Sequence, residues 1–287
     1  MTTNGVPIID MGTIANDWSG FCRNFGDAFK AIGFAVIKNH GINPNLFEDG
    51  YAAMKKAFAL DESLKRKCEI TEHTTGFIPF GTEHAKDDPR PDAKEIWDVR
   101  HRGMFFRDGQ FPAEVPELRT VTARLYAEFD LLSLSLLGAL DDYLVLTDDG
   151  MSAMAAGGDS LLRLLHYPEV KPGETGMRSA PHEDINFITL LPVATAPGLQ
   201  VKTNDGQWLD VAYEPNAVIV NAGDMLKMYS EHLGNPIPST THRVINLPGE
   251  RYSMPYFVHP RNEVELKPGM TAGAYLHERL LEIGLKK

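Results

Sequence analysis

Cysteine and long apolar runs are both scarce in this chain. Only two cysteines, Cys22 and Cys68, occur among 287 residues, and they form no C-x-x-C pair, which argues against a disulfide-stabilised secreted domain. No apolar run approaches the roughly 20 residues that a transmembrane helix requires. Residues 1–10 also lack the charged and apolar regions of a signal peptide. We therefore expect a cytoplasmic protein with no membrane partner and with both cysteines buried as structural thiols.

Positive charge is outnumbered by negative charge. The chain has 28 lysines and arginines against 39 aspartates and glutamates, which gives a formal net charge of -11. The summed field of such a chain repels phosphate backbones and anionic lipid. We expect no nucleic-acid partner, and only a local basic pocket could bind an anion.

Internal repeats, low-complexity tracts and linkers are also absent from the sequence. The composition, with 43% hydrophobic and 23% charged residues, is that of a chain that can bury a core. A length of 287 residues suits one domain with elaborations. We expect residues 1–287 to form a single compact unit.

The first half of the chain alternates strand and helix patterns. Apolar residues recur at helical spacing between Ile14 and Ile32, and a strand pattern follows at 34–37. Pro44 is placed to open a second helix. An apolar stripe from Leu118 to Leu140 predicts a long helix.

From about residue 160 the pattern changes to short β-rich segments bounded by turn residues. Serial strands of this kind predict a sandwich or jelly roll rather than βαβ units, and Asn204-Asp205-Gly206 predicts a hairpin turn. A last helix is expected at Tyr275–Leu285. The predicted fold class is therefore α+β, with helices packed around a C-terminal β core. The predicted strands are 161–167, 185–191, 199–202, 208–211, 217–221, 242–246 and 251–259.

Three residues have the types and spacing of a metal site. His182 and Asp184 are two residues apart just before a predicted strand, so a period of two points both side chains to one face. His242 begins another predicted strand and can supply a third ligand. Two neutral imidazoles and one carboxylate leave open positions on the ion, as in non-haem Fe(II) oxygenases, although a catalytic zinc can use the same set. An H-x-D pair alone is a weak signal.

The segment after His242 offers a partner for an anion. If Leu247-Pro248-Gly249-Glu250 connects a symmetric hairpin, Arg251 and Ser253 lie on the face that carries His242. Arg251 would then be about 13 Å from His242 along the strand, within reach of the far end of a five-carbon dicarboxylate that chelates the metal. Alternatively, Arg251 forms a surface salt bridge and Ser253 packs in the sheet.

Several short segments occur in a characteristic order along the chain. They are Val6-Pro7-Ile8-Ile9-Asp10, Asn39-His40-Gly41-Ile42, Lys94-Glu95, His182-Glu183-Asp184, Gly198-Leu199-Gln200-Val201, Asn221-Ala222-Gly223-Asp224, Ser239-Thr240-Thr241-His242-Arg243-Val244 and Arg251-Tyr252-Ser253. With these segments the chain resembles the isopenicillin-N-synthase-like family of Fe(II)- and 2-oxoglutarate-dependent oxygenases, and most closely its bacterial branch. The resemblance covers nearly the whole chain.

The resemblance implies a fold and a set of roles. It implies a double-stranded β-helix core over residues 158–262, preceded at 1–115 by a region like the non-haem dioxygenase N-terminal region. His182, Asp184 and His242 would be the iron ligands. The residues that would bind the cosubstrate 2-oxoglutarate are Arg251, Ser253 and Tyr167.

The chain departs from the family pattern beside that tyrosine. Many plant members carry asparagine where this chain has Leu165. The polar contact of that asparagine is then absent, or it is replaced by His166. We assign Asn221-Ala222-Gly223-Asp224 a structural role as a turn.

Other charged residues are candidates for the substrate site. Arg100 and Arg102, on a predicted strand with Trp97, could bind a substrate anion or could be solvated surface charges. Some histidines could also line a pocket. These are His84, His101, His166, His232 and His259.

Together these features predict an oxygenase that uses Fe(II), 2-oxoglutarate and O2 to oxidise a C–H bond of a small molecule, with release of succinate and carbon dioxide. One alternative is an oxidase like isopenicillin N synthase that does not use 2-oxoglutarate. A second is a zinc hydrolase, for which Glu183 would be the adjacent base, although on a strand it would point to the opposite face. The pattern leaves open the prime substrate, the oligomeric state and the choice among hydroxylation, desaturation and ring closure.

Overall fold

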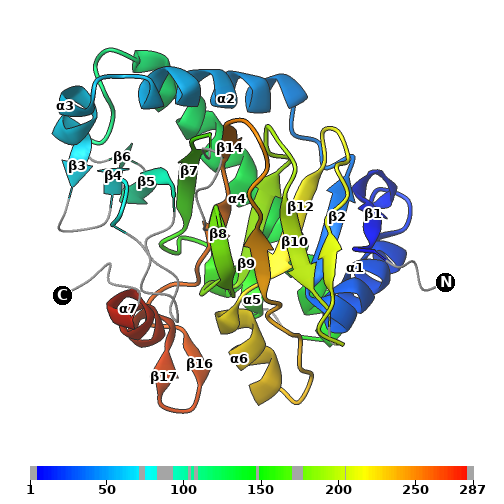
Figure 1. Cartoon of the computed structure of the whole chain (residues 1–287). Coiled ribbons are helices and arrows are strands. Elements are labelled where there is room, and N and C mark those ends of the chain that lie inside the picture. Colours follow the sequence, from blue (N-terminus) through cyan, green and yellow to red (C-terminus); the bar gives the residue numbers. More distant parts are fainter. Residues whose placement is uncertain are drawn as a thin grey trace.

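Two β-sheets lie at the centre of the molecule, and helices surround them (Figure 1). The computed structural model describes residues 5–282 except for 71–74, 83–92, 103–104, 107–108, 147–148, 170–176 and 204. The larger sheet has the order β1-β2-β12-β9-β15-β7-β5-β4-β3, with β14 also paired to β7 and β6 to β5. The smaller sheet has the order β11-β10-β13-β8. This arrangement confirms the predicted α+β class with a jelly-roll core.

The strands are short, as serial turn signals predict. They are β1 (Ile8–Asp10), β2 (Phe34–Lys38), β3 (Glu69–Ile70), β4 (Thr75–Ile78), β5 (Glu95–Arg102), β6 (Phe105–Phe106), β7 (Leu161–Tyr167), β8 (Ser179–His182), β9 (Ile188–Pro192), β10 (Leu199–Lys202), β11 (Trp208–Asp210), β12 (Val218–Ala222), β13 (His242–Val244), β14 (Arg251–Ser253), β15 (Tyr256–Val258), β16 (Glu265–Lys267) and β17 (Met270–Thr271).

The helices pack mainly around the larger sheet. They are α1 (Trp18–Ile32), α2 (Pro44–Phe58), α3 (Glu62–Lys65), α4 (Pro116–Leu144), α5 (Met151–Ala155), α6 (Asp224–His232) and α7 (Ala272–Glu282), with short 3₁₀ helices at Met11–Thr13 and Arg66–Cys68. The long helix α4 contacts α1, α2, α5 and the strands β9 and β15. None of the described helices is long and apolar enough to cross a membrane.

Alternation along β7 separates the core from the interior of the jelly roll. Leu162 and Leu164 point toward the helices and belong to the main hydrophobic cluster. Residues 161, 163, 165 and 167 point the other way and line a cavity between the sheets. This period of two is the reason why one strand can serve both the core and a binding site.

The start of the chain shows how local sequence sets the elements. Asp17 accepts a hydrogen bond from the Gly20 N–H at the start of α1, and Gly33 ends the helix with a φ of 65°. A side chain at Gly33 would meet the carbonyl oxygen of Pro238 at 2.2 Å. Glycine is therefore required there, both by the left-handed backbone and by the close approach.

Some predicted boundaries differ from those observed. The predicted strand at 251–259 is divided at Met254 and Pro255, where the proline lacks the N–H that a ladder needs. The helix α6 follows Asn221-Ala222-Gly223 and was not predicted. The hairpin at 204–206 does connect the antiparallel strands β10 and β11, but Asn204 itself lies outside the described residues.

Candidate active site

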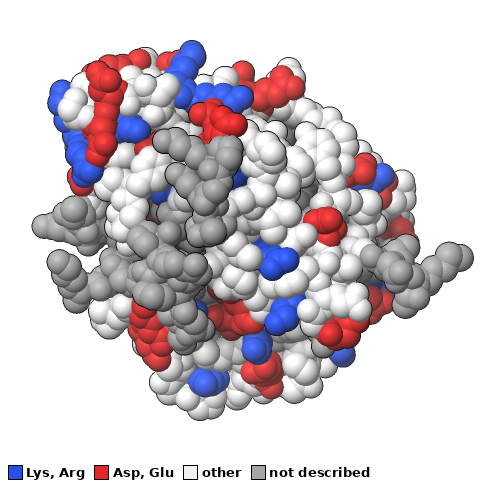
Figure 2. Space-filling view, in the orientation of Figure 1, with Lys and Arg blue, Asp and Glu red and all other residues white. Residues whose placement is uncertain are grey.

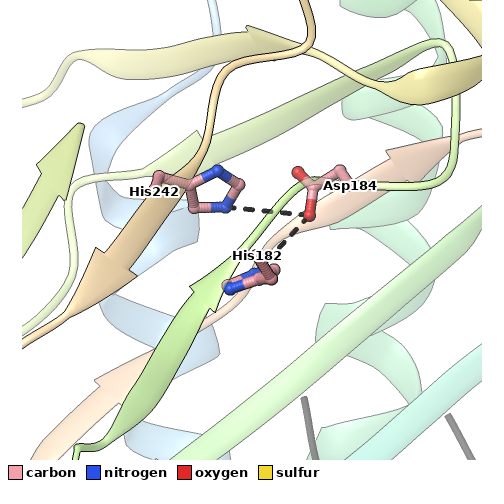
Figure 3. A group of neighbouring side chains, drawn as sticks. All are labelled: His182, Asp184 and His242. Carbon is pink, nitrogen blue, oxygen red and sulfur yellow. Dashed lines mark ion pairs between the residues drawn. The ribbon is translucent and has the colours of Figure 1, made fainter. Parts of the chain in front are cut away.

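His182, Asp184 and His242 converge inside the jelly roll (Figure 3). His242 on β13 lies opposite His182 at the end of β8, and the two ring centres are 4.3 Å apart. The Nε2 atoms of His182 and His242 lie 3.8 and 3.7 Å from Oδ1 of Asp184. Within the described part of the chain, this is the one cluster of three such residues with ligand atoms all within 4.8 Å of one another.

Strand periodicity explains this convergence only in part. β8 ends at His182, so Asp184 lies in the following loop and not on a strand. The loop turns the carboxylate back toward His182, and its position is fixed by hydrogen bonds to the larger sheet. The predicted convergence is observed, but the predicted reason, a shared strand face, was wrong for Asp184.

The hydrogen bonds of His182 and His242 at Nδ1 leave their Nε2 atoms available to a metal ion. Nδ1 of His182 lies 2.8 Å from the carbonyl oxygen of Ala180, and Nδ1 of His242 lies 3.1 Å from that of Thr240. A carbonyl oxygen only accepts, so each Nδ1 carries the hydrogen and each Nε2 keeps its lone pair. The donor set therefore fits a divalent ion.

Two hydrogen bonds to Oδ2 hold the carboxylate of Asp184 in place. Oδ2 accepts hydrogen bonds from Oγ1 of Thr189 at 2.6 Å and from Nδ2 of Asn221 at 2.8 Å. Oδ1 is thereby turned toward the two imidazoles. The assignment of Asn221 to a purely structural turn was therefore wrong, because its amide orients this carboxylate.

The electrostatics of the cluster favour the protonation states that a metal ion needs. Burial, followed by the neighbouring His242, lowers the pKa of His182 to about 4. Burial alone would raise the pKa of Asp184, but His242, His182 and the two hydrogen bonds outweigh it and hold that pKa below its usual value. At neutral pH the cluster thus offers a neutral imidazole at His182 and a carboxylate at Asp184.

His182, Asp184 and His242 line a cavity of about 480 Å³. One end is lined by Tyr167, Arg251 and Ser253, and the other by Arg100, Arg163, Phe257, His259 and the α7 residues Leu276, Arg279 and Leu280. Leu161 lies opposite Arg100 and Leu165 lies opposite Ser253, so β7 runs along the wall from one end to the other. The three-residue cluster and the buried Arg100 and Arg251 thus line one cavity.

Comparison with known proteins identifies this arrangement. Residues 158–260 match the 2OG-Fe(II) oxygenase superfamily, and residues 6–115 match the non-haem dioxygenase in morphine synthesis N-terminal family. The crystal structure of a putative 2OG-Fe(II) oxygenase family protein from Caulobacter crescentus is 32% identical, with a TM-score of 0.86 over 98% of this chain and 100% of that one. The chain belongs to the 2OG-Fe(II) oxygenase superfamily.

Other relatives of this oxygenase come from fungi and plants. A full-length Neurospora crassa protein, solved in complex with alpha-KG, is 27% identical, with a TM-score of 0.85 over 98% of each chain. The flavonol synthase/flavanone 3-hydroxylase of Arabidopsis thaliana is 29% identical over 277 residues, which cover 93% of this chain and 79% of the relative. The oxygenase thus uses Fe(II), 2-oxoglutarate and O2 to oxidise a C–H bond of a small molecule, with release of succinate and carbon dioxide.

The Arg251 end of the oxygenase cavity differs from the predicted hairpin. β13 pairs with β8 and β10 in the smaller sheet, whereas β14 pairs with β7 in the larger one, so the connection between them crosses between sheets. Arg251 lies opposite Tyr167, and Ser253 lies opposite Leu165. The hairpin prediction was wrong, but the crossing brings Arg251, Ser253 and His242 to one cavity.

Arg251 is buried without a carboxylate partner among the described residues. It is 2% exposed, its Nε donates to the carbonyl oxygen of Ala196 at 3.2 Å, and its Nη1 has no hydrogen-bond partner. The guanidinium lies 5.3 Å from the centre of the Tyr167 ring. A buried cation with a free donor is a strong site for an anion. The surface salt bridge considered for Arg251 is therefore contradicted.

Arg178 is a residue that the sequence did not single out. It is fully buried, and its Nη2 donates to the carbonyl oxygens of Leu247 and Gly249 in the connection that precedes Arg251. Burial, followed by the charge of Arg251, lowers its pKa. Arg178 thus anchors the crossing that carries Arg251. Its sequence context shows no motif, because the anchoring depends on two carbonyl groups about seventy residues away.

His166 does not take the place of the missing asparagine. Its Nδ1 pairs with Glu95 at 2.7 Å and its ring stacks on Tyr252, on the face of β7 that points away from the cavity. Leu165 lines the cavity instead. The polar contact considered for His166 is thus contradicted, and this part of the wall is apolar.

Glu183 is also placed differently from its prediction. It follows the end of β8 and lines the cavity, where its carboxylate accepts a hydrogen bond from Oγ1 of Thr241 at 3.1 Å. The argument that a strand turns Glu183 away was wrong, since Glu183 is not on a strand. Membership in the oxygenase superfamily, rather than this geometry, argues against the zinc hydrolase.

Arg100 lies at the far end of the cavity, and it is 8% exposed. It is therefore not a solvated surface charge. Trp97 points to the opposite face of β5 and is fully buried in the core. The side chain of Arg102 lies outside the described ones. Of the candidate histidines that the structure describes, His259 lines the cavity, and burial, followed by the charge of Arg100, lowers its pKa to about 4. His84 and the side chain of His101 lie outside the described residues.

Proposed function

We propose that His182, Asp184 and His242 are the three protein ligands of Fe(II) in this oxygenase. The proposal rests on three atoms that have no hydrogen-bond partner among the described residues: Nε2 of His182, Oδ1 of Asp184 and Nε2 of His242. Hydrogen bonds at the other nitrogen of each ring and at the other oxygen of the carboxylate orient these atoms toward one another. Two imidazoles and one carboxylate leave positions for a chelating cosubstrate and for O2. When bound, the iron supplies the oxidising chemistry, and the residues around it position the two organic molecules.

We further propose that Arg251, Ser253 and Tyr167 bind the far carboxylate of 2-oxoglutarate. The uncommitted Nη1 of Arg251 supports this role, as does the pairing of Arg251 with Tyr167 across β14 and β7. A guanidinium can grip a carboxylate with two parallel hydrogen bonds. Ser253 is buried on the same face and can add a neutral donor.

The residues that line the cavity separate the site of 2-oxoglutarate from the site of the prime substrate. Arg251 holds the cosubstrate at one end, while the chain keeps water away with Leu161, Leu165 and Phe257. The prime substrate then enters from the end lined by α7.

The proposal is tested by metal analysis and by product release in one protein preparation. Purified chain reconstituted with Fe(II) under nitrogen should bind one equivalent of iron, and the Asp184→Ala variant should bind none after gel filtration. Oxygen and 2-oxoglutarate should then give succinate in the unsubstituted protein only. Retention of iron by Asp184→Ala would contradict the ligand assignment.

We propose that the chain is a bacterial member of the isopenicillin-N-synthase-like branch, supported by its similarity to the Caulobacter crescentus protein. We also propose that residues 158–262 form the oxygenase core, that 1–115 form an N-terminal region, and that 1–287 make one compact unit.

We propose a cytoplasmic protein that binds no nucleic acid. The net charge of -11 supports the absence of a nucleic-acid partner. On the face in Figure 2, the described lysines and arginines are interspersed with aspartates and glutamates. Such mixing gives no basic track for a phosphate backbone.

A further inference from the structure

One row of cross-strand pairs leads from the metal cluster to Arg100. The row consists of Asn221, Thr189, Phe257, Leu161 and Arg100, each directly opposite the next. Directly opposite residues share a face of the sheet, and all five line the cavity. Thr189 and Asn221 hold Asp184. Arg100 is three strand spacings from Thr189, or about 14 Å.

The middle of this row is apolar. Phe257 and Leu161 lie between Thr189 and Arg100, and Leu276 and Leu280 of α7 also line the cavity. The path from the metal cluster to Arg100 therefore begins and ends with polar groups and has apolar side chains between them, with the Arg163 guanidinium 5.8 Å from the centre of the Phe257 ring. A ligand that fits this path has an apolar body and a charged end.

Three arginines line this end of the cavity, Arg100, Arg163 and Arg279. They differ in how strongly their N–H groups already bind carboxylates of the protein. Arg163 forms a two-pronged pair with the fully buried Asp98, at 2.8 and 2.9 Å. Arg279 pairs with Glu282 at 2.6 Å and lies 3.9 Å from Asp224, although its Nε, like that of Arg100, has no hydrogen-bond partner in the described structure. Arg163 and Arg279 therefore already have carboxylate partners. Arg163 has one in close, two-pronged contact, and Arg279 has one at each of two nitrogens.

Arg100 is the least committed of the three. Its Nη1 lies 3.2 Å from Oδ2 of Asp159 and 3.3 Å from the carbonyl oxygen of the same residue, while its Nε is buried and has no hydrogen-bond partner in the described structure. The Asp159 side chain is 45% exposed. Since water can solvate that carboxylate, another carboxylate can replace it at Arg100 at little cost.

Building on the proposed function, we propose that the prime substrate is a carboxylate with an apolar body, and that its carboxylate binds Arg100 in place of Asp159. The apolar body lies over Leu161 and Phe257. The C–H bond to be oxidised lies at the Thr189 end of the row, beside Asp184. Arg100 is thus the residue that selects an anionic substrate.

The test measures binding and does not depend on turnover. Fe(II)-loaded protein, saturated with 2-oxoglutarate under nitrogen, is titrated calorimetrically with phenylacetate, cinnamate and octanoate, and with the primary amide of each. Saturating 2-oxoglutarate keeps these acids from the Arg251 end. We expect at least one acid to bind at least about tenfold more tightly than its amide, because only the acid forms a charge-assisted pair.

Substitutions then assign that preference to Arg100. Arg100→Gln should abolish the preference for the acid, and Arg100→Lys should keep part of it, since lysine retains the charge but not the fork. Asp159→Asn should strengthen acid binding by a few fold, because it removes the competing carboxylate. Arg119→Gln, the same charge change on an exposed face of α4, should change nothing.

The outcomes separate a folding defect from a failed proposal. Acid and amide are measured on the same preparation, so a loss of folded protein leaves the ratio of their affinities unchanged. An acid-to-amide ratio that survives Arg100→Gln, or no binding of any acid to the unsubstituted protein, would overturn the proposal. Failure of 2-oxoglutarate itself to bind would instead overturn the proposed function.

Discussion

Each end of the cavity has a buried arginine, but among the described residues only one of the two arginines has a carboxylate partner. Arg251 is 2% exposed and has a carbonyl acceptor and a free Nη1, with no carboxylate partner in the described structure. Arg100 is 8% exposed and pairs with Asp159, which is half open to solvent. An anion that binds Arg251 displaces no carboxylate of the described chain, whereas a carboxylate that binds Arg100 has to displace Asp159.

The difference follows from the strands that carry the two residues. Arg251 lies on β14, whose neighbour β7 supplies Tyr167 and whose approach is anchored by Arg178. Arg100 lies on β5, opposite Leu161 at the start of β7, and residues of α7 line the same cavity. The proposed cosubstrate end is therefore held by strand pairing and by the hydrogen bonds of Arg178, whereas the proposed substrate end has an arginine whose counter-ion is partly exposed.

The largest effect is expected from the cluster that serves both ends. His242→Ala removes one of three proposed ligands, so bound iron and succinate formation should both fall below detection. The β core should stay folded, as judged by circular dichroism. Iron retention with full activity in this variant would contradict the assignment.

The next largest effect separates the two arginines. Arg251→Gln should raise the 2-oxoglutarate concentration needed for half-maximal succinate release, because breaking a buried charged pair costs about 2 to 5 kcal/mol, or roughly thirty- to several-thousand-fold. The bound iron should stay near the unsubstituted level. An equal rise in that concentration for Arg100→Gln would contradict the claim that the two arginines bind different ligands.

A smaller effect is expected where the row of paired residues meets the cluster. Asn221→Ala removes one of the two hydrogen bonds to Oδ2 of Asp184, and loss of such an orienting bond commonly weakens metal affinity by about 10- to 100-fold. Competition with a metal chelator measures the change. An unchanged affinity would show that Thr189 alone orients the carboxylate.

The smallest effect is expected at Ser253. Ser253→Ala removes a neutral donor, which is typically worth about 0.5 to 1.5 kcal/mol, so 2-oxoglutarate affinity should fall by only about two- to tenfold. A loss as large as that of Arg251→Gln would mean that Ser253 is needed to place the arginine.

The sequence predicts the elements and the residue types of the site better than it predicts how the strands pair. Strands 161–167 and 199–202 and the helix from Pro44 have the predicted bounds or start, because their alternation and turn residues are local signals. The partner of Arg251 was mispredicted, since a short connection after His242 suggests a hairpin while the strands belong to different sheets. Nothing in Leu247-Pro248-Gly249-Glu250 distinguishes these cases.

The contacts of each arginine likewise could not be predicted from the residues next to it in the sequence. Arg100 appears in the sequence among other charges, and only the pairing of β5 with β7 places it in line with Thr189 and Asn221. Asn221 was assigned to a turn because its glycine neighbour is a turn signal. Its bond to Asp184 spans 37 residues of sequence, and a single sequence carries no record of such a contact.

Calorimetric titration of 2-oxoglutarate into Fe(II)-loaded protein under nitrogen tests the central claim most directly, that the cavity has one arginine for each ligand. The unsubstituted protein and the Arg100→Gln variant should bind 2-oxoglutarate with the same affinity, while Arg251→Gln should bind it at least about thirtyfold more weakly. Equal binding by all three proteins, or a loss caused by Arg100→Gln alone, would contradict the account.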